Sequence, residues 1–162
     1  MFTRSTREGV DRALEELGGD VQVVATLHAD WLTDKAYNVT TDLINSGTEF
    51  NYIFANNDMM AQGCYNALKD AGKENIPIVS TGGSPDGFKM LQDGIEAANM
   101  TAPVSIQGVK TFMNLYNKVA LGEDPAEKFT ALPVIPVSAD DTSSYIAWDD
   151  YAAAYKYLGE NK

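Results

Sequence analysis

The sequence predicts an α/β fold with a doubly wound parallel sheet, and three observations support this prediction. Segments of helical periodicity alternate with short runs of β-branched and other apolar residues. Successive strand-like runs begin roughly 20 to 30 residues apart, which is the length of a right-handed crossover unit. Polar residues and glycines directly follow two of these runs, as at the ligand-binding edge of an open parallel sheet.

Three elements are expected in the first part of the chain. Apolar residues at helical spacing predict a helix over 3–17, which a pair of glycines ends. The short β-branched run 21–27 predicts a strand. Thr33 or Asp34 can cap a second helix, which Gly47 ends. The chain thus begins with a helix, whereas a doubly wound sheet usually opens with a strand, so we expect an unusual topology or a piece of a longer protein.

The stretch from Asn51 to Asp86 is the most informative part of the sequence. It predicts a strand over 52–55, a helix over 58–71 and a strand over 76–80. The first strand ends in Asn-Asn-Asp and the second in Thr-Gly-Gly-Ser-Pro-Asp. Because ligands bind at the carboxyl ends of strands in open parallel sheets, these residues indicate the floor of a ligand cleft.

The rest of the chain starts with a helix that its first residues define. Ser84 is a suitable cap, and Pro85 occupies the first helical position of a short helix that ends near Gly94. The remaining elements are expected as a strand over 95–102, a helix over 103–121, a strand over 131–137 and a closing helix over 148–158. An aromatic run in the tail is spaced for helix packing, and its members are Tyr145, Trp148, Tyr151, Tyr155 and Tyr157.

Composition excludes several classes of function. The 162 residues carry a net charge of −11, which argues against nucleic acid and against an anionic membrane surface. No apolar run is long enough to insert into a membrane, and the first residues do not form a signal peptide. The single cysteine, Cys64, falls on the apolar face of a helix and is expected in the core.

Catalysis, metals and cofactors are not expected. The only histidine, His28, has no spacing to a serine or cysteine that would support nucleophilic catalysis. The glycines at 82 and 83 lack the Gly-Lys-Ser/Thr ending of a phosphate-binding loop. We therefore expect a binding protein rather than an enzyme.

Several segments together resemble a known family. Residues Asn57–Gly63 are similar to its Asn-Asp-x-Met-Ala-x-Gly motif, and Arg7–Asp11 resembles the glycine-containing start of the first helix of its second lobe. Residues 71–79, 83–86 and 93–94 follow in the same order. The chain thus resembles the C-terminal part of a type I periplasmic sugar-binding protein of the ribose-binding kind, from about residue 3 to 137.

The resemblance implies two lobes that enclose a sugar-like ligand and deliver it to the permease of an ABC importer. It implies a periplasmic or extracellular protein, with its signal peptide outside this chain. Residues 3–102 would form a second-lobe domain that lacks its first strand, 103–137 would return to an absent first lobe, and 138–162 would form an acidic linker and a C-terminal helix. Surfaces exposed in such a C-terminal fragment could also pair two copies in a homodimer.

Two residues fill places where the family contacts its sugar. Asn57 offers an amide with donors and an acceptor for hydroxyl groups, and ligand contact is the stronger expectation, the alternative being a cap of the following helix. Trp31 could stack its indole on a sugar ring or anchor its loop. The neighbouring Asp58 could contact ligand, but holding the loop or capping the helix is the stronger expectation.

Three other places depart from the family pattern. Thr6 stands where the family often has an arginine, Gly82 where it has an aspartate, and Thr101 where it has a glutamine. Losing the two charged groups removes strong hydrogen bonds to hydroxyls. The resemblance therefore implies either a different or less polar sugar-like ligand or a remodelled site.

Other functions remain open from sequence. The chain could be the effector-binding domain of a sugar-responsive transcription regulator, which would need a basic DNA-binding headpiece. It could be a small doubly wound enzyme, which would need a catalytic pair or phosphate loop. It could also be a fragment that folds without enclosing a ligand.

Overall fold

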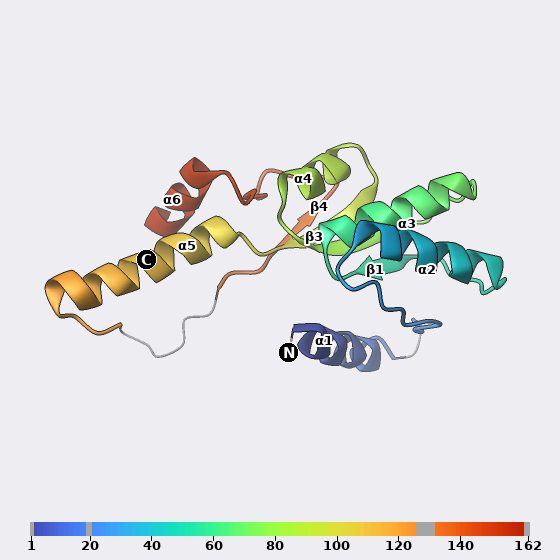
Figure 1. Ribbon diagram of the computed structural model, residues 1–162, viewed down its shortest axis with the longest axis horizontal. Helices are drawn as coiled ribbons and strands as arrows, with labels where there is room; N and C mark the ends of the chain where they lie inside the picture. The colour runs from blue at the N-terminus through green and yellow to red at the C-terminus, as the bar shows by residue number, and fades with distance from the viewer. Residues whose placement is uncertain (1, 19–20, 126–131, 161–162) are drawn as a thin grey trace. The chain divides into compact units, whose positions relative to one another are not determined.

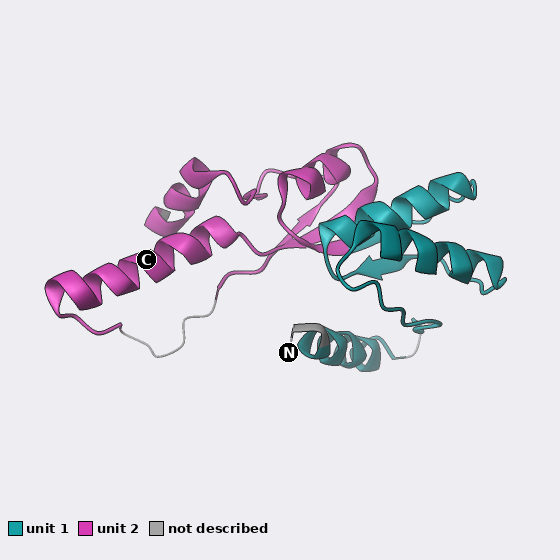
Figure 2. Ribbon diagram, viewed as in Figure 1, with its two compact units in different colours: residues 1–79 teal, residues 80–162 magenta. Residues whose placement is uncertain are grey.

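The computed structural model describes residues 2–18, 21–125 and 132–160 (Figure 1). The chain divides into two compact units, which we call unit 1, Met1–Val79, and unit 2, Ser80–Lys162 (Figure 2). The predicted α/β class with a mainly parallel sheet is confirmed. The strand order is β1-β2-β3-β4.

Unit 1 is built mainly from helices. Its elements are α1 (Phe2–Glu16), α2 (Thr33–Asn45), β1 (Ile53–Ala55), α3 (Asp58–Asp70) and the beginning of β2 (Ile78–Gly82). The buried side chains come mostly from α2, β1 and α3, and they include Ala36, Ala55, Ala61, Cys64, Ala67 and Leu68. The backbone N–H of Ile53 donates to the carbonyl of Pro77 at 3.1 Å, which joins β1 to the entry of β2.

The contact between α2 and α3 depends on a glycine of the sequence motif. A Cβ atom added at Gly63 would lie 2.2 Å from the carbonyl oxygen of Thr33 and 2.9 Å from the Cβ atom of Ala36. Only a residue without a side chain fits where the two helices approach so closely. The small buried Cys64 beside it accepts a hydrogen bond from the Thr40 hydroxyl at 3.3 Å, which confirms its expected place in the core.

Two predictions for unit 1 are wrong. Residues 21–27 form no strand, because no strand lies beside them among the described residues to complete a ladder. The N-cap of α2 is Leu32, and no side chain caps this helix, so neither Thr33 nor Asp34 has that role. The first helix is confirmed, although Gly19 lies outside the described residues.

Unit 2 contains the remaining strands and helices. Its elements after β2 are α4 (Pro85–Gln92), β3 (Glu96–Thr101), α5 (Val104–Tyr116), the π-helix η1 (Asn117–Leu121), β4 (Ile135–Ser138) and α6 (Tyr151–Glu160). β4 runs antiparallel to β3, with Asn99 opposite Val137 and Thr101 opposite Ile135.

The helix ends of unit 2 follow local sequence rules closely. The Ser84 hydroxyl accepts a hydrogen bond from the Gly87 N–H at 3.0 Å and caps α4, and Pro85 begins that helix, both as predicted.

The long helix expected over 103–121 is divided, because its last turn is the π-helix η1. Gly122 ends it in a left-handed conformation, with φ of 74°. The strand expected over 131–137 begins at Ile135, and Ala131 lies outside the described residues.

The aromatic run of the tail does not form one helical face. Tyr145 and Trp148 precede α6 and pack within unit 2, so their predicted helical role is wrong. The Tyr145 ring lies 4.9 Å from that of Phe88, and its hydroxyl donates to the Ser84 carbonyl at 2.7 Å. Tyr151 and Tyr155 belong to α6 and are exposed. A turn at residues 148–149, before α6 begins, thus separates residues that the sequence spacing suggested to be together.

Candidate functional site

The six residues singled out from sequence fall in both units. Thr6, Trp31, Asn57 and Asp58 belong to unit 1, whereas Gly82 and Thr101 belong to unit 2.

Asn57 is the N-cap of α3. Its backbone is extended, with φ of −161°, and its side-chain Oδ1 accepts a hydrogen bond from the Met60 N–H at 2.8 Å. This confirms the capping role that the sequence left open beside ligand contact. The cap uses the oxygen of the amide, and the Nδ2 group carries the two donors with which an asparagine can bind hydroxyls. The two roles are therefore compatible in one side chain.

Asp58 is the first residue of α3 and is buried. A carboxylate in the first turn of a helix is stabilised by the positive end of the helix dipole. The geometry favours a structural role for Asp58, in keeping with the stronger expectation from sequence.

Trp31 has an unusual backbone conformation. Both Asp30 and Trp31 have positive φ, of 47° and 66°. Positive φ in a bulky residue such as Trp31 costs free energy, and such strain clusters at functional sites. Trp31 is 43% exposed, so it is not a fully buried loop anchor. The Asp30 carboxylate pairs with the Lys35 ammonium, which lowers the pKa of Asp30 and raises that of Lys35.

A large cavity lies within unit 1, with a volume of about 1570 Å³. Thr6 and Trp31 both line it, together with Asn56 at the carboxyl end of β1. Asn57 and Asp58 are not among its lining residues. The structure thus brings Thr6 and Trp31 to one cavity. Asn57 does not line this cavity, but it follows the lining residue Asn56 in the sequence.

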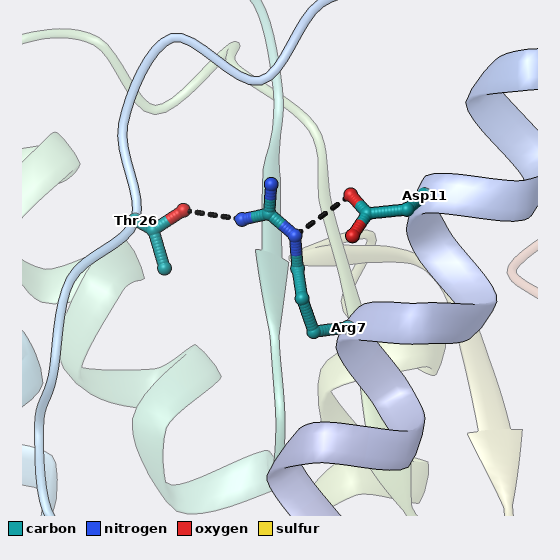
Figure 3. Close-up of polar contacts among 3 residues, drawn as sticks. All are labelled: Arg7, Asp11 and Thr26. Atoms are coloured by element: carbon teal, nitrogen blue, oxygen red, sulfur yellow. Dashed lines mark hydrogen bonds and ion pairs between the residues drawn. The ribbon is translucent and has the colours of Figure 1, made fainter.

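Arg7 is a further polar residue of this cavity that the sequence analysis did not single out as a site. Figure 3 shows its guanidinium between Asp11 on α1 and Thr26 in the segment between α1 and α2. Its Nε donates to Asp11 Oδ1 and its Nη1 donates to the Thr26 hydroxyl, both at 2.8 Å. Its position next to Thr6, where the family often has an arginine, was the available signal.

In unit 2, Gly82 ends β2 and is tied to two other segments. Its carbonyl accepts a hydrogen bond from the Ala102 N–H at 2.7 Å and one from the Trp148 indole at 3.3 Å. The backbone N–H of Trp148 donates to the Gly83 carbonyl at 2.9 Å. Trp148 therefore covers Gly82 and Gly83. No local sequence pattern could have predicted this contact, because Trp148 and Gly82 lie 66 positions apart in the chain.

Thr101 is fully buried at the end of β3. Its hydroxyl donates to the carbonyl of Ile135 on β4 at 3.1 Å. The side chain thus helps hold the antiparallel pair of strands together. Its contact with ligand stays a prediction.

A buried polar cluster joins β2 to β3 in unit 2. Ser80, Glu96 and Asn99 are each fully buried. The Ser80 hydroxyl donates to Glu96 Oε1 at 2.8 Å, and Asn99 Nδ2 donates to Glu96 Oε2 and to Ser80 Oγ, both at 2.9 Å. A buried carboxyl group needs such partners, because an unsatisfied one would cost much of the stability of the domain. The only sequence signal was a polar residue within each apolar run.

Other chemistry is limited in the described part of the chain. Burial raises the pKa of the Cys64 thiol, so this group is kept neutral and poorly nucleophilic. Among the described residues, no cluster of three or more His, Cys, Asp or Glu side chains is placed to hold a metal ion. Every helix within the described ranges is too short or too polar to cross a membrane.

Comparisons with known proteins agree with this geometry. A family model described as a periplasmic binding protein domain matches residues 3–124. The ribose import binding protein of Salmonella typhimurium is 35% identical over 107 residues, which are 66% of this chain and 36% of that protein. The xylitol-binding protein of Mycolicibacterium smegmatis is 35% identical over 88 residues, which are 54% of this chain and 25% of that protein. The chain thus spans about a third or less of the length of these curated relatives.

Solved structures show the same fold. An ABC transporter solute-binding protein from Bacillus halodurans with bound myo-inositol has a TM-score of 0.76 at 24% identity, covering 91% of this chain and 48% of that one. A periplasmic solute-binding protein from Actinobacillus succinogenes with bound D-allose also has a TM-score of 0.76 at 24% identity, covering 86% of this chain and 48% of that one.

Proposed function

Because the chain belongs to the periplasmic binding protein domain family, we propose that it is part of the solute-binding component of an ABC-type importer, with a sugar or a sugar-like polyol as ligand. The observation that carries this proposal is the ligand class of its relatives. Ribose, xylitol and D-allose appear in the names of curated relatives that are at least 34% identical over their matched lengths. All three are small polyhydroxylated molecules, and the names describe binding and import.

Trp31 and Asn57 are the proposed main contacts in unit 1. The exposed indole of Trp31 offers an apolar face for a sugar ring. The Asn57 amide can donate to hydroxyl groups through Nδ2 while its oxygen holds the cap of α3. Thr6 lies on the same cavity as Trp31 and would add a hydroxyl.

The other three candidates are proposed with smaller roles. Asp58 and Thr101 are buried, and Gly82 has no side chain. A ligand would reach Gly82 and Thr101 mainly through the backbone at the end of β2 and β3. In this proposal the ligand is less polar at these places than a ligand held by arginine and aspartate would be.

The proposed mechanism is reversible binding by closure of two lobes, without covalent chemistry. The proposed partners are the ligand and the membrane permease of the importer, in the periplasm or outside the cell. The exposed apolar side chains Phe112, Leu115 and Tyr155 of unit 2 also support pairing with a second copy. The names of the relatives, which describe import and binding, favour this function over a transcription regulator or an enzyme.

A thermal-shift screen of the chain against pentoses, hexoses, polyols and nucleosides tests the proposal. A ligand that binds the native state raises the unfolding midpoint in a dose-dependent manner. We expect a sugar or polyol to do so and nucleosides not to. If no compound of the panel changes the unfolding midpoint, and unfolding is still cooperative, the result would contradict ligand binding by this chain.

Two pairs of variants separate ligand contact from structure. Asn57→Asp keeps an oxygen for the cap of α3 but removes the amide donors, whereas Asn57→Ser keeps a cap and a hydroxyl donor. Trp31→Gly relieves the positive φ but removes the indole, whereas Trp31→Phe keeps an aromatic face. We expect Asn57→Asp and Trp31→Gly to reduce the ligand-induced shift most. If all four variants keep the ligand-induced shift of the parent chain, neither residue belongs to the site.

A further inference from the structure

Trp31 lies in a tight turn that directly precedes α2. The Leu32 N–H donates to the Ala29 carbonyl at 2.9 Å, which closes a four-residue turn. The two central residues, Asp30 and Trp31, have φ of 47° and 66°. Positive φ at both central positions is the mark of a type I′ turn, in which Gly, Asn and Asp dominate these positions. Trp31 is therefore held in a conformation that a bulky side chain disfavours.

Packing does little to impose this conformation. Ala29 is buried at the start of the turn, whereas Asp30, Trp31 and Leu32 are exposed. Burial therefore fixes where the turn begins and leaves its central residues largely in solvent. A strained backbone persists only where other contacts hold it, so a contact from outside the turn is expected.

An ion pair provides such a contact. Oδ2 of Asp30, at the first central position, accepts a hydrogen bond from Nζ of Lys35 at 2.5 Å. Lys35 belongs to the first turn of α2, where the positive end of the helix dipole disfavours a cation. The place of this lysine is thus explained by the turn it reaches back to rather than by the helix that carries it.

The pair is strong enough to act on the turn but not on the whole domain. The Asp30 and Lys35 side chains are 68% and 48% exposed, and exposed ion pairs change an equilibrium by about fivefold at most. That factor is small beside the folding equilibrium of a domain. It is large enough to choose between two conformations of one turn. A site loses affinity in proportion when its binding-competent conformation is less populated.

The conformation of the turn decides where the indole lies. The direction of the Cα–Cβ bond follows from the backbone, so relaxation to negative φ would turn the Trp31 side chain away from its present place. That place is on the unit 1 cavity, which Asp30 and Asn56 also line. An indole that stacks on a sugar ring must meet the ring at a defined angle, so a change in the turn would change binding.

We propose that Lys35 is a positioning residue of the sugar site: its ion pair with Asp30 holds the turn 29–32 in the conformation that presents the Trp31 indole to a sugar or polyol. Lys35 acts through the turn and does not touch the ligand. The role in binding rests on the proposed function, whereas the effect of the pair on the indole is independent of any ligand.

Fluorine NMR of the chain labelled with fluorotryptophan tests the effect on the indole without ligand. The chain has two tryptophans, so the spectrum has two resonances, and Trp31→Phe assigns them. We expect Lys35→Met to shift or split the Trp31 resonance. Lys35→Arg keeps the charge and should restore the spectrum of the parent chain. A Trp31 resonance that is unchanged in Lys35→Met would overturn the proposal.

Lys89→Met is the matched control. Lys89 also forms an exposed ion pair, with Asp93 at 2.6 Å in unit 2, so this variant loses the same charge and the same kind of contact on a different element. We expect its Trp31 resonance to match that of the parent. The unfolding midpoints of both lysine variants should stay close to that of the parent, because exposed pairs contribute little to stability. The same change of the Trp31 resonance in Lys89→Met would overturn the proposal, since net charge would then be the cause.

Calorimetric titration with ribose, xylitol and D-allose tests the role in binding. For each probe that the parent binds, we expect Lys35→Met to raise the Kd by about two- to fivefold, and Lys89→Met to leave it unchanged. Sodium chloride at about 1 M should cause the same loss in the parent but not in Lys35→Met, because it screens exposed pairs. Equal Kd values for the parent and Lys35→Met would overturn the role in binding.

A double variant separates positioning from direct contact. Asp30→Asn removes the charge but keeps a residue that tolerates positive φ. Within Asp30→Asn, we expect Lys35→Met to cause no further rise in Kd. A further rise would mean that Lys35 contacts the probe itself, which would overturn the positioning role. If none of the three probes binds the parent, the proposed function fails for them together with the role of the turn in binding them. The fluorine spectrum then still decides whether the pair holds the indole.

Discussion

The indole of Trp148 lies directly against Gly83 in unit 2. A Cβ atom added at Gly83 would lie 3.0 Å from Nε1 of this indole and 3.3 Å from its Cδ1. The same indole nitrogen donates to the carbonyl of the preceding Gly82. The glycine therefore has two reasons to be a glycine, since its φ of 118° is also unfavourable for any residue with a side chain.

Gly83→Ala should destabilise unit 2 by about 1–3 kcal/mol, because it adds both backbone strain and a close contact with Trp148. Urea unfolding followed by far-UV circular dichroism measures this change. Gly94→Ala is the matched control, since Gly94 also has positive φ but an added Cβ atom would meet open space. A loss of stability at Gly83 no larger than that at Gly94 would show that the indole contact has no energetic weight.

Gly63→Ala should destabilise unit 1 by about 1–3 kcal/mol or more, because its Cβ atom would press on the backbone oxygen of Thr33. The helices α2 and α3 would have to move apart. Gly9→Ala on α1 is the control, because no atom lies near its added Cβ. That change should stabilise α1 slightly, through helix propensity. The pair is compared by the midpoint of urea unfolding.

Glu96→Ala should destabilise unit 2 by about 1–3 kcal/mol, because it leaves the Ser80 hydroxyl and the Asn99 amide without their shared acceptor. Glu96→Gln preserves the shape of the side chain and one acceptor oxygen, so its loss should be smaller. Thermal unfolding of the two variants measures the difference. Equal stability of the Glu96→Ala variant and the parent chain would mean that the cluster contributes nothing net to the fold.

Cys64 should make the protein less stable at alkaline pH. Burial raises the pKa of its thiol in the folded state, so the thiol ionises first in the unfolded chain. Below about pH 8.5 the thiol is neutral in both states and has no effect on stability. As the pH rises above that value, the unfolded state gains the thiolate and the free energy of unfolding falls.

The measurement is urea unfolding of the parent and of Cys64→Ala across pH 7 to 10, where only the parent should show this thiol-linked loss. The same burial should make alkylation of Cys64 by iodoacetamide slow in the folded protein and fast in urea. Rapid alkylation without denaturant would contradict the buried position. Other groups also titrate between pH 7 and 10. The contribution of the thiol is therefore the difference between the parent and Cys64→Ala in how the free energy of unfolding changes with pH.

The elements that could be predicted from the sequence are those with local causes. The cap at Ser84, the proline beside it and the helices α3 and α5 follow from residues within one or two turns of each other. The capping role of Asn57 was visible for the same reason. Its ligand role was suggested only by resemblance, and it stays a prediction with those of Trp31, Thr6, Asp58, Gly82 and Thr101.

The features that the sequence did not predict depend on partners far away in the chain. Residues 21–27 have the composition of a strand, but a strand exists only when another strand lies beside it, and none does among the described residues. The position of Trp148 over Gly82 and Gly83 likewise depends on hydrogen bonds to residues more than 60 positions away in the chain. The amino-acid sequence alone thus determined the fold class, the caps of α3 and α4 and the family, because these rest on local pattern. Only the tertiary structure decided which edges are paired, which polar groups are buried together and where space remains, because these depend on contacts between distant segments.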